Sequence, residues 1–94
     1  MHPLIVKNRQ AVRRLAAKHG VTHVSVFGSF ARGQESLESD VDFLIKVSTE
    51  TSPWFPGGLI ADLEELLGRR VDVVEDKVLN PLIRDQVLAE AMPL

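Results

Sequence analysis

The stretch Val24–Lys46, VSVFGSFARGQESLESDVDFLIK, decides how the rest of the sequence is interpreted. It begins with an apolar β-like run, Val24–Phe27, and passes through a Gly-Ser turn into a loop rich in Gln, Glu and Ser. A second β-like run follows and carries Asp40 and Asp42 near its start. Because side chains alternate between the two faces of a strand, this pattern predicts that both carboxylates project from the same face.

Two carboxylates held side by side repel each other, and the repulsion raises a pKa unless a cation lies between them. A divalent metal ion with oxygen ligands is the ordinary solution. Gly28 and Ser29 end the first run, where unpaired backbone N–H groups and the Ser29 hydroxyl can hold an anion such as phosphate. A phosphate site that faces a metal-binding carboxylate pair indicates phosphoryl or nucleotidyl transfer.

A third acidic residue, Asp72, lies within another apolar run, Val71–Glu75. A carboxylate flanked by valines in a strand must be solvated, paired or metal-bound. Simpler interpretations exist for the other residues: Gly28-Ser29 as a tight turn with a helix cap, Asp40 as a loop end, and Asp42 as a charge that protects an edge strand. The three carboxylates and the turn, taken together and in this order, favour a transferase-type site.

Two short motifs carry a resemblance to a known family: GSFARG at residues 28–33 and SDVD at residues 39–42. Together they resemble the signature of the DNA polymerase β-like nucleotidyltransferase superfamily. The small size of the chain is similar to that of its minimal nucleotidyltransferases, which are stand-alone domains usually encoded beside a HEPN-domain protein as antitoxin and toxin. The resemblance covers most of the chain. It implies an α/β (α+β) fold with a small mixed β-sheet and helices packed on one face.

The resemblance also implies a role for each site residue. Asp40 and Asp42 are expected to bind two Mg²⁺ ions that hold the triphosphate of ATP and orient the attacking hydroxyl, and Asp72 is expected to bind metal or take the hydroxyl proton. The expected nucleotide-binding residues are Gly28, Ser29 and Arg32. From the sequence alone, Arg32 is as readily a solvated side chain or a partner of Glu35 or Glu38. Lys46 is a weaker candidate for the same role.

The function implied by the resemblance is transfer of AMP from ATP to a hydroxyl, which in the antitoxin setting is a tyrosine of the HEPN toxin. The alternative is a non-catalytic antitoxin that neutralises its partner by binding alone. An intact motif favours the enzyme. A transferase for a small molecule such as an aminoglycoside is disfavoured, because the chain lacks the extra domain that would enclose such a substrate.

Length and composition limit the remaining possibilities. The 94 residues predict a single domain, residues 1–94, that buries roughly 60–65% of its unfolded surface. The absence of cysteine excludes disulfides and thiolate chemistry. A net charge of −2 makes nucleic acid an unexpected ligand. No apolar run approaches the ~20 residues that span a bilayer, so a cytoplasmic protein without membrane contact is expected.

Apolar periodicity and breaker residues predict the remaining elements. A helix is expected from Pro3 to His19, and strands are expected at Val24–Phe27, Val41–Val47 and Val71–Glu75. Ser48–Gly58 is predicted to be a loop, and a helix that ends at Gly68 follows it. A last helix is expected to begin after Asn80 and Pro81, to end at Pro93, and to have one apolar face formed by Leu82, Ile83, Val87, Leu88 and Met92.

Two groups of residues remain open. Trp54 and Phe55 are the only adjacent aromatic pair, and we expect them to dock on the core, while stacking on a base or contact with a partner protein are the alternatives. His2, His19 and His23 have no metal-ligand spacing and are predicted to be surface or cap residues.

Overall fold

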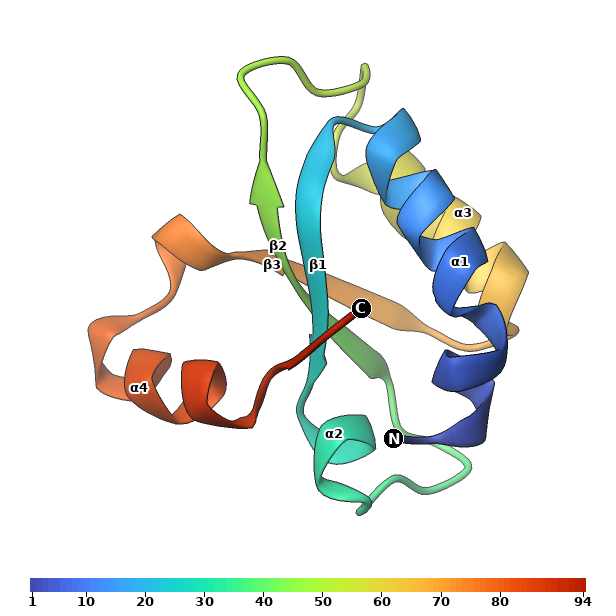
Figure 1. Cartoon of the computed structure of the whole chain (residues 1–94), viewed down its shortest axis with the longest axis vertical. Coiled ribbons are helices and arrows are strands. Elements are labelled where there is room, and N and C mark those ends of the chain that lie inside the picture. Colours follow the sequence, from blue (N-terminus) through green and yellow to red (C-terminus); the bar gives the residue numbers. More distant parts are fainter.

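The computed structural model describes residues 1–94 and is built around a four-stranded mixed β-sheet with the strand order β3-β2-β1-β4 (Figure 1). The strands are β1 (Val21–Phe27), β2 (Val41–Val47), β3 (Val71–Glu75) and β4 (Met92–Pro93). The helices are α1 (Pro3–Lys18), α2 (Ser29–Arg32), α3 (Gly57–Leu67), η1 (Asp76–Val78, a 3₁₀ helix) and α4 (Pro81–Glu90). The mixed sheet and the α/β class predicted from the sequence are confirmed.

The register of the sheet brings three distant parts of the chain into one row. β2 pairs with β1 in antiparallel orientation and with β3 in parallel orientation, and α3 is the crossover that the parallel pair requires. Phe27 of β1 lies opposite Asp42 of β2, and Asp42 lies opposite Asp72 of β3. Residues in one row project from the same face of a sheet, so the end of β1 and the two acidic residues meet at one place.

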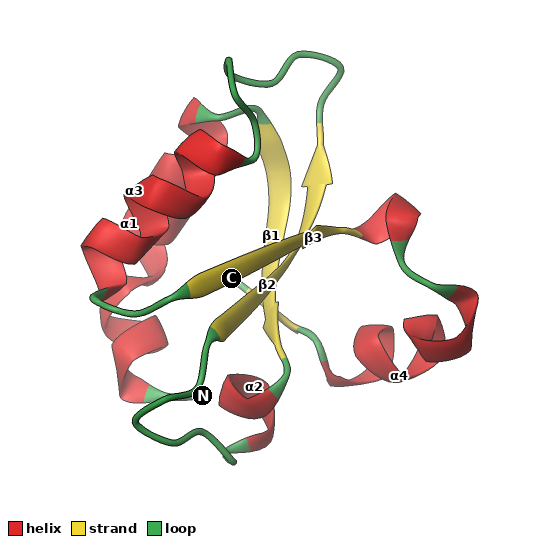
Figure 2. Ribbon diagram, turned by 180° about the vertical axis from the view of Figure 1, so that it is seen from behind, coloured by secondary structure: helices red, strands yellow, loops and turns green.

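The core lies between the sheet and the two long helices. α1 and α3 run side by side over one face of the sheet, as Figure 1 and Figure 2 show. Phe43 and Ile45 of β2, Val12 of α1 and Leu63 of α3 are buried in this layer. Burial of such a side chain stabilises the fold by about 1.5–3 kcal/mol, so this layer holds β2 and β3 firmly behind their acidic residues. None of the helices combines the length and the apolar character that crossing a membrane requires.

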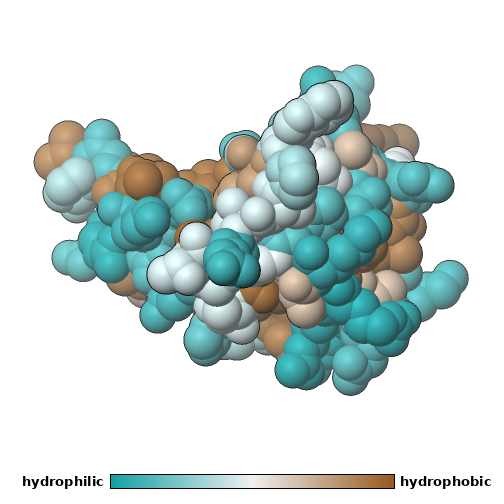
Figure 3. All heavy atoms as spheres, turned by 90° about the horizontal axis from the view of Figure 1, so that it is seen from above, coloured by the Kyte–Doolittle hydropathy of each residue, from teal (hydrophilic) through white to brown (hydrophobic).

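The last helix, α4, lies on the other side of the sheet and stands apart from the α1 and α3 layer (Figure 2). The expectation that the helices pack on one face therefore holds for α1 and α3 and is wrong for α4. Its buried residue Val87 packs with Leu79 on Leu44, which points away from the main core. Figure 3 shows this side of the molecule as a separate lobe that carries apolar surface. The exposed apolar side chains of α4 are Leu82, Ile83 and Leu88. Of the five apolar residues predicted to form its inner face, only Val87 is buried as part of the helix, because Met92 lies beyond its end.

The ends of three elements differ from the prediction. α3 begins at Gly57, so the last two residues of the predicted loop Ser48–Gly58 belong to the helix. β1 begins at Val21, three residues early, because Val21 is buried and pairs with Val47. The final helix ends at Glu90 and does not include Met92, which pairs with Val26 as part of β4. The start of the same helix is confirmed, because the Asn80 side chain accepts a hydrogen bond from the Leu82 N–H at 2.9 Å.

Two of the three histidines act as helix caps, but one of them is not on the surface. His2 caps α1 as predicted, and its Nδ1 accepts a hydrogen bond from the Leu4 N–H at 3.0 Å. His19 is the C-cap of α1, which agrees with the prediction of a surface or cap residue, but it is buried, which the sequence did not indicate. Its Nε2 lies 2.7 Å from Asp62 Oδ2 of α3, and its Nδ1 contacts the Ser52 hydroxyl. His19 thereby connects the loop before α3 to both long helices.

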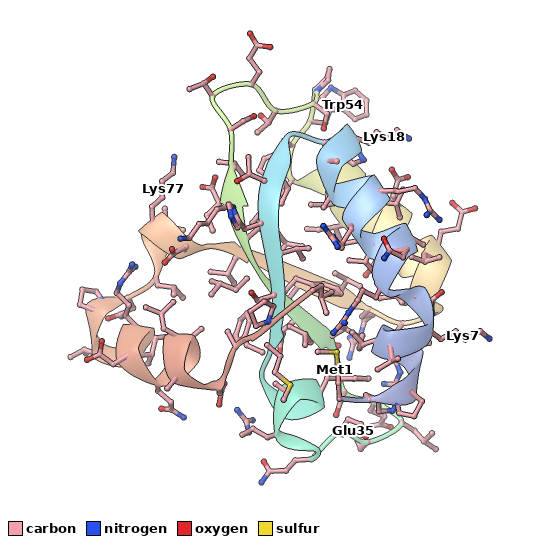
Figure 4. The ribbon with its side chains drawn as sticks, in the orientation of Figure 1. Met1, Lys7, Lys18, Glu35, Trp54 and Lys77 are labelled. Atoms are coloured by element: carbon pink, nitrogen blue, oxygen red, sulfur yellow. The ribbon has the colours of Figure 1, made fainter.

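The two aromatic residues of that loop separate. Phe55 packs against the main core, as predicted. Trp54 is 91% exposed, so the prediction of a core anchor is wrong for this residue. Figure 4 shows Trp54 at the end of the molecule near Lys18, far from α2. A role in stacking on a base held next to α2 is therefore not supported by its position.

Candidate active site

The site lies where β1 ends, at the edge formed by the row of Phe27, Asp42 and Asp72. Asp42 is half-buried, and Asp72 is exposed to solvent on the neighbouring strand. The apolar residues on either side of each aspartate turn toward the core, which leaves the two carboxylates on the face opposite α1 and α3. The structure thus brings together two of the three acidic residues predicted from the sequence.

Gly28 is required by the geometry of the turn that joins β1 to α2. Its φ of +71° and ψ of −152° lie in a backbone region that is essentially restricted to glycine. A Cβ added at this position would overlap Oδ2 of Asp42 and would lie 3.2 Å from its Cγ. The backbone of Gly28 therefore approaches Asp42 as closely as it does only because Gly28 has no side chain.

The carboxylates repel one another. The pKa of the Asp42 carboxyl is raised, first because partial burial disfavours its charged form and then because Asp72 and Asp40 are negatively charged neighbours. Arg32 opposes this shift, and Glu90 adds to it. Asp42 is thus the centre of a concentration of negative charge that one arginine balances only in part.

Asp40 is turned partly away from this pair. It lies directly before β2, and its Oδ1 is 3.1 Å from Nε of Arg70 in an ion pair whose angles do not make a hydrogen bond. This oxygen is buried and accepts no hydrogen bond at all. In this arrangement no three His, Asp or Glu side chains are grouped to hold a metal ion.

The residues nevertheless fit a hard divalent cation in their chemistry. Asp42 and Asp72 supply adjacent carboxylate oxygens, their mutual repulsion is relieved by a cation, and Asp40 has a buried oxygen without a hydrogen-bond donor. Oxygen ligands are the ones that Mg²⁺ prefers. For Asp40 to complete the set, its side chain must turn from Arg70 toward Asp42.

Positive and N–H groups for an anion lie on the other side of Asp42. The Gly28 N–H and the guanidinium of Arg32 both donate to the carboxylate of Glu90, at 3.2 Å for the N–H and 3.1 Å for Arg32 Nη1. Arg32 also donates through Nε to Gln34 Oε1 at 3.1 Å, which helps to hold its side chain. Its partner is thus Glu90, not Glu35 or Glu38 as the sequence suggested. Ser29 begins α2 but is not the cap, because Gly28 occupies that position.

The sequence interpretation missed two residues of the site and included one that lies elsewhere. Glu90 and Arg70 were not identified, because each is far from its partners in the sequence and neither belongs to a motif. Lys46 lies toward the other end of β2 from Asp42, is exposed, and its Nζ is 3.8 Å from Asp76 Oδ2. Lys46 therefore does not contribute charge to this site.

Comparison with known sequences gives consistent relatives. A model of the nucleotidyltransferase domain family matches residues 8–92. A protein of Methanocaldococcus jannaschii named "Putative protein adenylyltransferase" is 40% identical over 75 residues, which make up 80% of this chain and 81% of that protein. The protein adenylyltransferase MntA of Thermococcus cleftensis is 38% identical over 80 residues, with 85% of this chain and 81% of that protein covered.

Solved structures give the same result for the fold. A structure titled as a putative minimal nucleotidyltransferase matches with a TM-score of 0.84 and 43% identity, and the match covers 96% of this chain and 92% of the other. A toxin–antitoxin structure with AMP-PNP matches with a TM-score of 0.77 and 19% identity, covering 92% of this chain and 71% of the other. At this lower identity the second match concerns the fold alone.

Proposed function

Because this chain belongs to the nucleotidyltransferase domain family, as a minimal nucleotidyltransferase, we propose that it transfers AMP from ATP to a hydroxyl of a partner protein. The resemblance noted in the GSFARG and SDVD motifs is thereby confirmed at the level of the family. The observation that carries the proposal is the row in which Asp42 and Asp72 lie side by side next to the Gly28 turn. The naming of its relatives as protein adenylyltransferases supports the class of acceptor.

The proposed reaction is a displacement at the α-phosphate. The oxygen of the acceptor hydroxyl attacks the α-phosphorus, the bond from this phosphorus to the bridging oxygen breaks, and pyrophosphate leaves with the bond's electrons. The proton of the hydroxyl passes to the carboxylate of Asp72, which is the exposed member of the row and is open to an incoming acceptor. The Gly28 N–H and Arg32 bind the outer phosphates, because both already donate to an anionic group at this position.

Asp42 and Asp72, with Asp40 turned inward, are the residues that would hold Mg²⁺. When bound there, Mg²⁺ supplies neutralisation of the charge that grows on the phosphates during transfer. Asp40 and Asp42 were predicted as the first two ligands, and their placement here is compatible with that role. Two ions are the number that the family resemblance implies.

The proposed acceptor is a tyrosine of a HEPN-domain toxin, for which this chain would act as antitoxin. The fold match to toxin–antitoxin structures supports a toxin as the partner class. The open position of Asp72 supports an acceptor that is a protein, since an exposed carboxylate is accessible to a side chain on the surface of a large partner.

The test is to incubate the protein with ATP, Mg²⁺ and a HEPN-domain protein encoded beside it, and to measure the mass of the partner and the release of pyrophosphate. The wild type should add one or more AMP units. Asp72→Ala should lose the transfer while it still binds ATP, and Lys46→Ala, a charge change at the far end of β2, should leave the transfer intact. If the partner is neutralised in cells by wild type and Asp72→Ala alike, with no mass change in either case, the protein is a binding-only antitoxin.

A further inference from the structure

Glu90 holds the position that an anionic ligand of this site would take. It is the last residue of α4, and its side chain is only 18% exposed. One carboxylate oxygen accepts a hydrogen bond from the Gly28 N–H at 3.2 Å, and both oxygens accept from Nη1 of Arg32 at 3.1 Å. A carboxylate and a phosphate oxygen accept the same hydrogen bonds from the same donors. The chain thus places its own anion on the two groups that would hold the phosphates.

This contact adds negative charge where the site already has an excess. Glu90 faces Asp42, which has Asp72 and Asp40 as its other acidic neighbours, while Arg32 is the one cation that acts on it from this side. A triphosphate brought to Gly28 and Arg32 would meet the charge of Glu90 at the same donors. Both anions cannot occupy these donors together, because the Gly28 N–H has a single hydrogen to donate.

The attachment of Glu90 allows it to leave. Apart from the bonds to Gly28 and Arg32, its carboxylate has no other hydrogen bond or ion pair in the structure. Three of the apolar side chains of α4 remain exposed, and Val87 is the only residue of the helix that is buried. Rotation of the Glu90 side chain, or a small movement of this lightly packed helix, therefore frees the donors without opening the main core.

We infer that Glu90 is an internal competitor for the nucleotide, which has to leave Gly28 and Arg32 before the phosphates of ATP can bind. This inference rests on the proposed function, because it concerns the same site. Competition of this kind raises the apparent Kd for ATP, which equals the intrinsic Kd divided by the fraction of molecules in which the donors are free. Glu90 thereby sets the concentration of ATP at which the site fills, and it does not act on the reacting atoms.

The experiment measures binding of ATP with Mg²⁺, and of inorganic triphosphate, to four proteins by calorimetry: wild type, Glu90→Gln, Glu90→Asp and Asp85→Asn. Asp85 is the matched control, because it lies on the same helix, is exposed and removes the same charge when changed. Glu90→Gln should tighten both ligands by about tenfold, which corresponds to about 1.4 kcal/mol. Glu90→Asp, which keeps the charge but shortens the reach, should tighten them by less, and Asp85→Asn should match wild type.

Two further readouts separate competition from a structural or catalytic role. Glu90→Gln should lower the melting temperature of the nucleotide-free protein and enlarge its rise with ATP and Mg²⁺. It should also increase AMP transfer at low ATP and give the wild-type rate at saturating ATP. If the wild type binds ATP and Glu90→Gln binds it equally well or more weakly, the inference is overturned and the proposed function still stands. Binding of ATP by none of the four proteins would overturn both.

Discussion

The sharpest test of the site geometry is the change Gly28→Ala, compared with Gly33→Ala. Both glycines have a φ of +71°, but ψ is −152° at Gly28 and 25° at Gly33. An added Cβ at Gly33 meets nothing within 4 Å, whereas at Gly28 it overlaps Asp42 Oδ2 and lies 3.4 Å from Asp42 Cβ. The two positions thus differ both in backbone region and in contact with the acidic row, and both differences disfavour alanine at Gly28.

The expected magnitudes follow from these two differences. Alanine in the left-handed helical region of Gly33 costs roughly 1–2 kcal/mol. At Gly28 the backbone region alone costs about 1–3 kcal/mol, and displacement of the Asp42 side chain adds about 1–3 kcal/mol. For a domain of this size each kcal/mol lowers the melting temperature by about 4–8 °C. Gly28→Ala should therefore melt clearly below Gly33→Ala.

The assay is thermal unfolding of both variants by circular dichroism, followed by AMP transfer at a temperature where both are folded. Gly33→Ala should retain transfer, while Gly28→Ala should lose it, because Asp42 no longer lies beside Asp72. Equal melting temperatures for the two variants, or full transfer by a folded Gly28→Ala protein, would refute the argument that the turn and the acidic row are built against each other.

Four further substitutions test the site and the packing around it. Asp42→Asn should stabilise the nucleotide-free protein at pH 7, since the raised pKa means that the charged form is disfavoured in the fold. The difference in the free energy of unfolding between Asp42→Asn and wild type, measured by urea titration, should vanish as the pH falls below about 4, where Asp42 is protonated in both the folded and the unfolded chain. Asp62→Ala should destabilise at pH 7, because the hydrogen bond from His19 lowers the pKa of Asp62, and the difference from wild type should shrink as the pH falls through this lowered value. Phe55→Ala should cost about 1.5–3 kcal/mol in the free energy of unfolding, whereas Trp54→Ala should change it by less than about 0.5 kcal/mol.

The sequence was sufficient for those features that depend on local pattern. The strand from Val41 to Val47 and the strand from Val71 to Glu75 were predicted with the bounds that the structure has, because short runs of apolar residues between breakers leave few alternatives. A parallel pairing of these strands through one helix then places Asp42 and Asp72 on neighbouring strands. The positive φ at Gly28 was likewise predicted, since a Gly-Ser pair after a strand is typical of a tight turn that needs glycine.

The features that sequence reasoning missed depend on contacts between distant residues. His19 is buried because Ser52 and Asp62, which lie 33 and 43 residues away, satisfy both of its ring nitrogens. Met92 leaves the last helix because β1 offers it an unpaired edge, which no local pattern reveals. Adjacent residues of a loop need not share an environment. Trp54 is exposed and Phe55 packs on the core, so their hydrophobicity alone did not predict which of them is buried.

Contacts between distant residues also explain why the partners of the site residues, Arg70 and Glu90, were not predicted. Asp40 is paired with Arg70, and the donors Gly28 and Arg32 are paired with Glu90. Asp40, Gly28 and Arg32 thus already have partners within the chain, whereas Asp42 and Asp72 have no ion pair of their own. In the proposed function, a bound cation and triphosphate would take the places of Arg70 and Glu90 at these groups. None of the four residues in the two ion pairs belongs to the core formed with α1 and α3, so we expect the loss of these ion pairs to lower the affinity for ligands while the core stays unchanged.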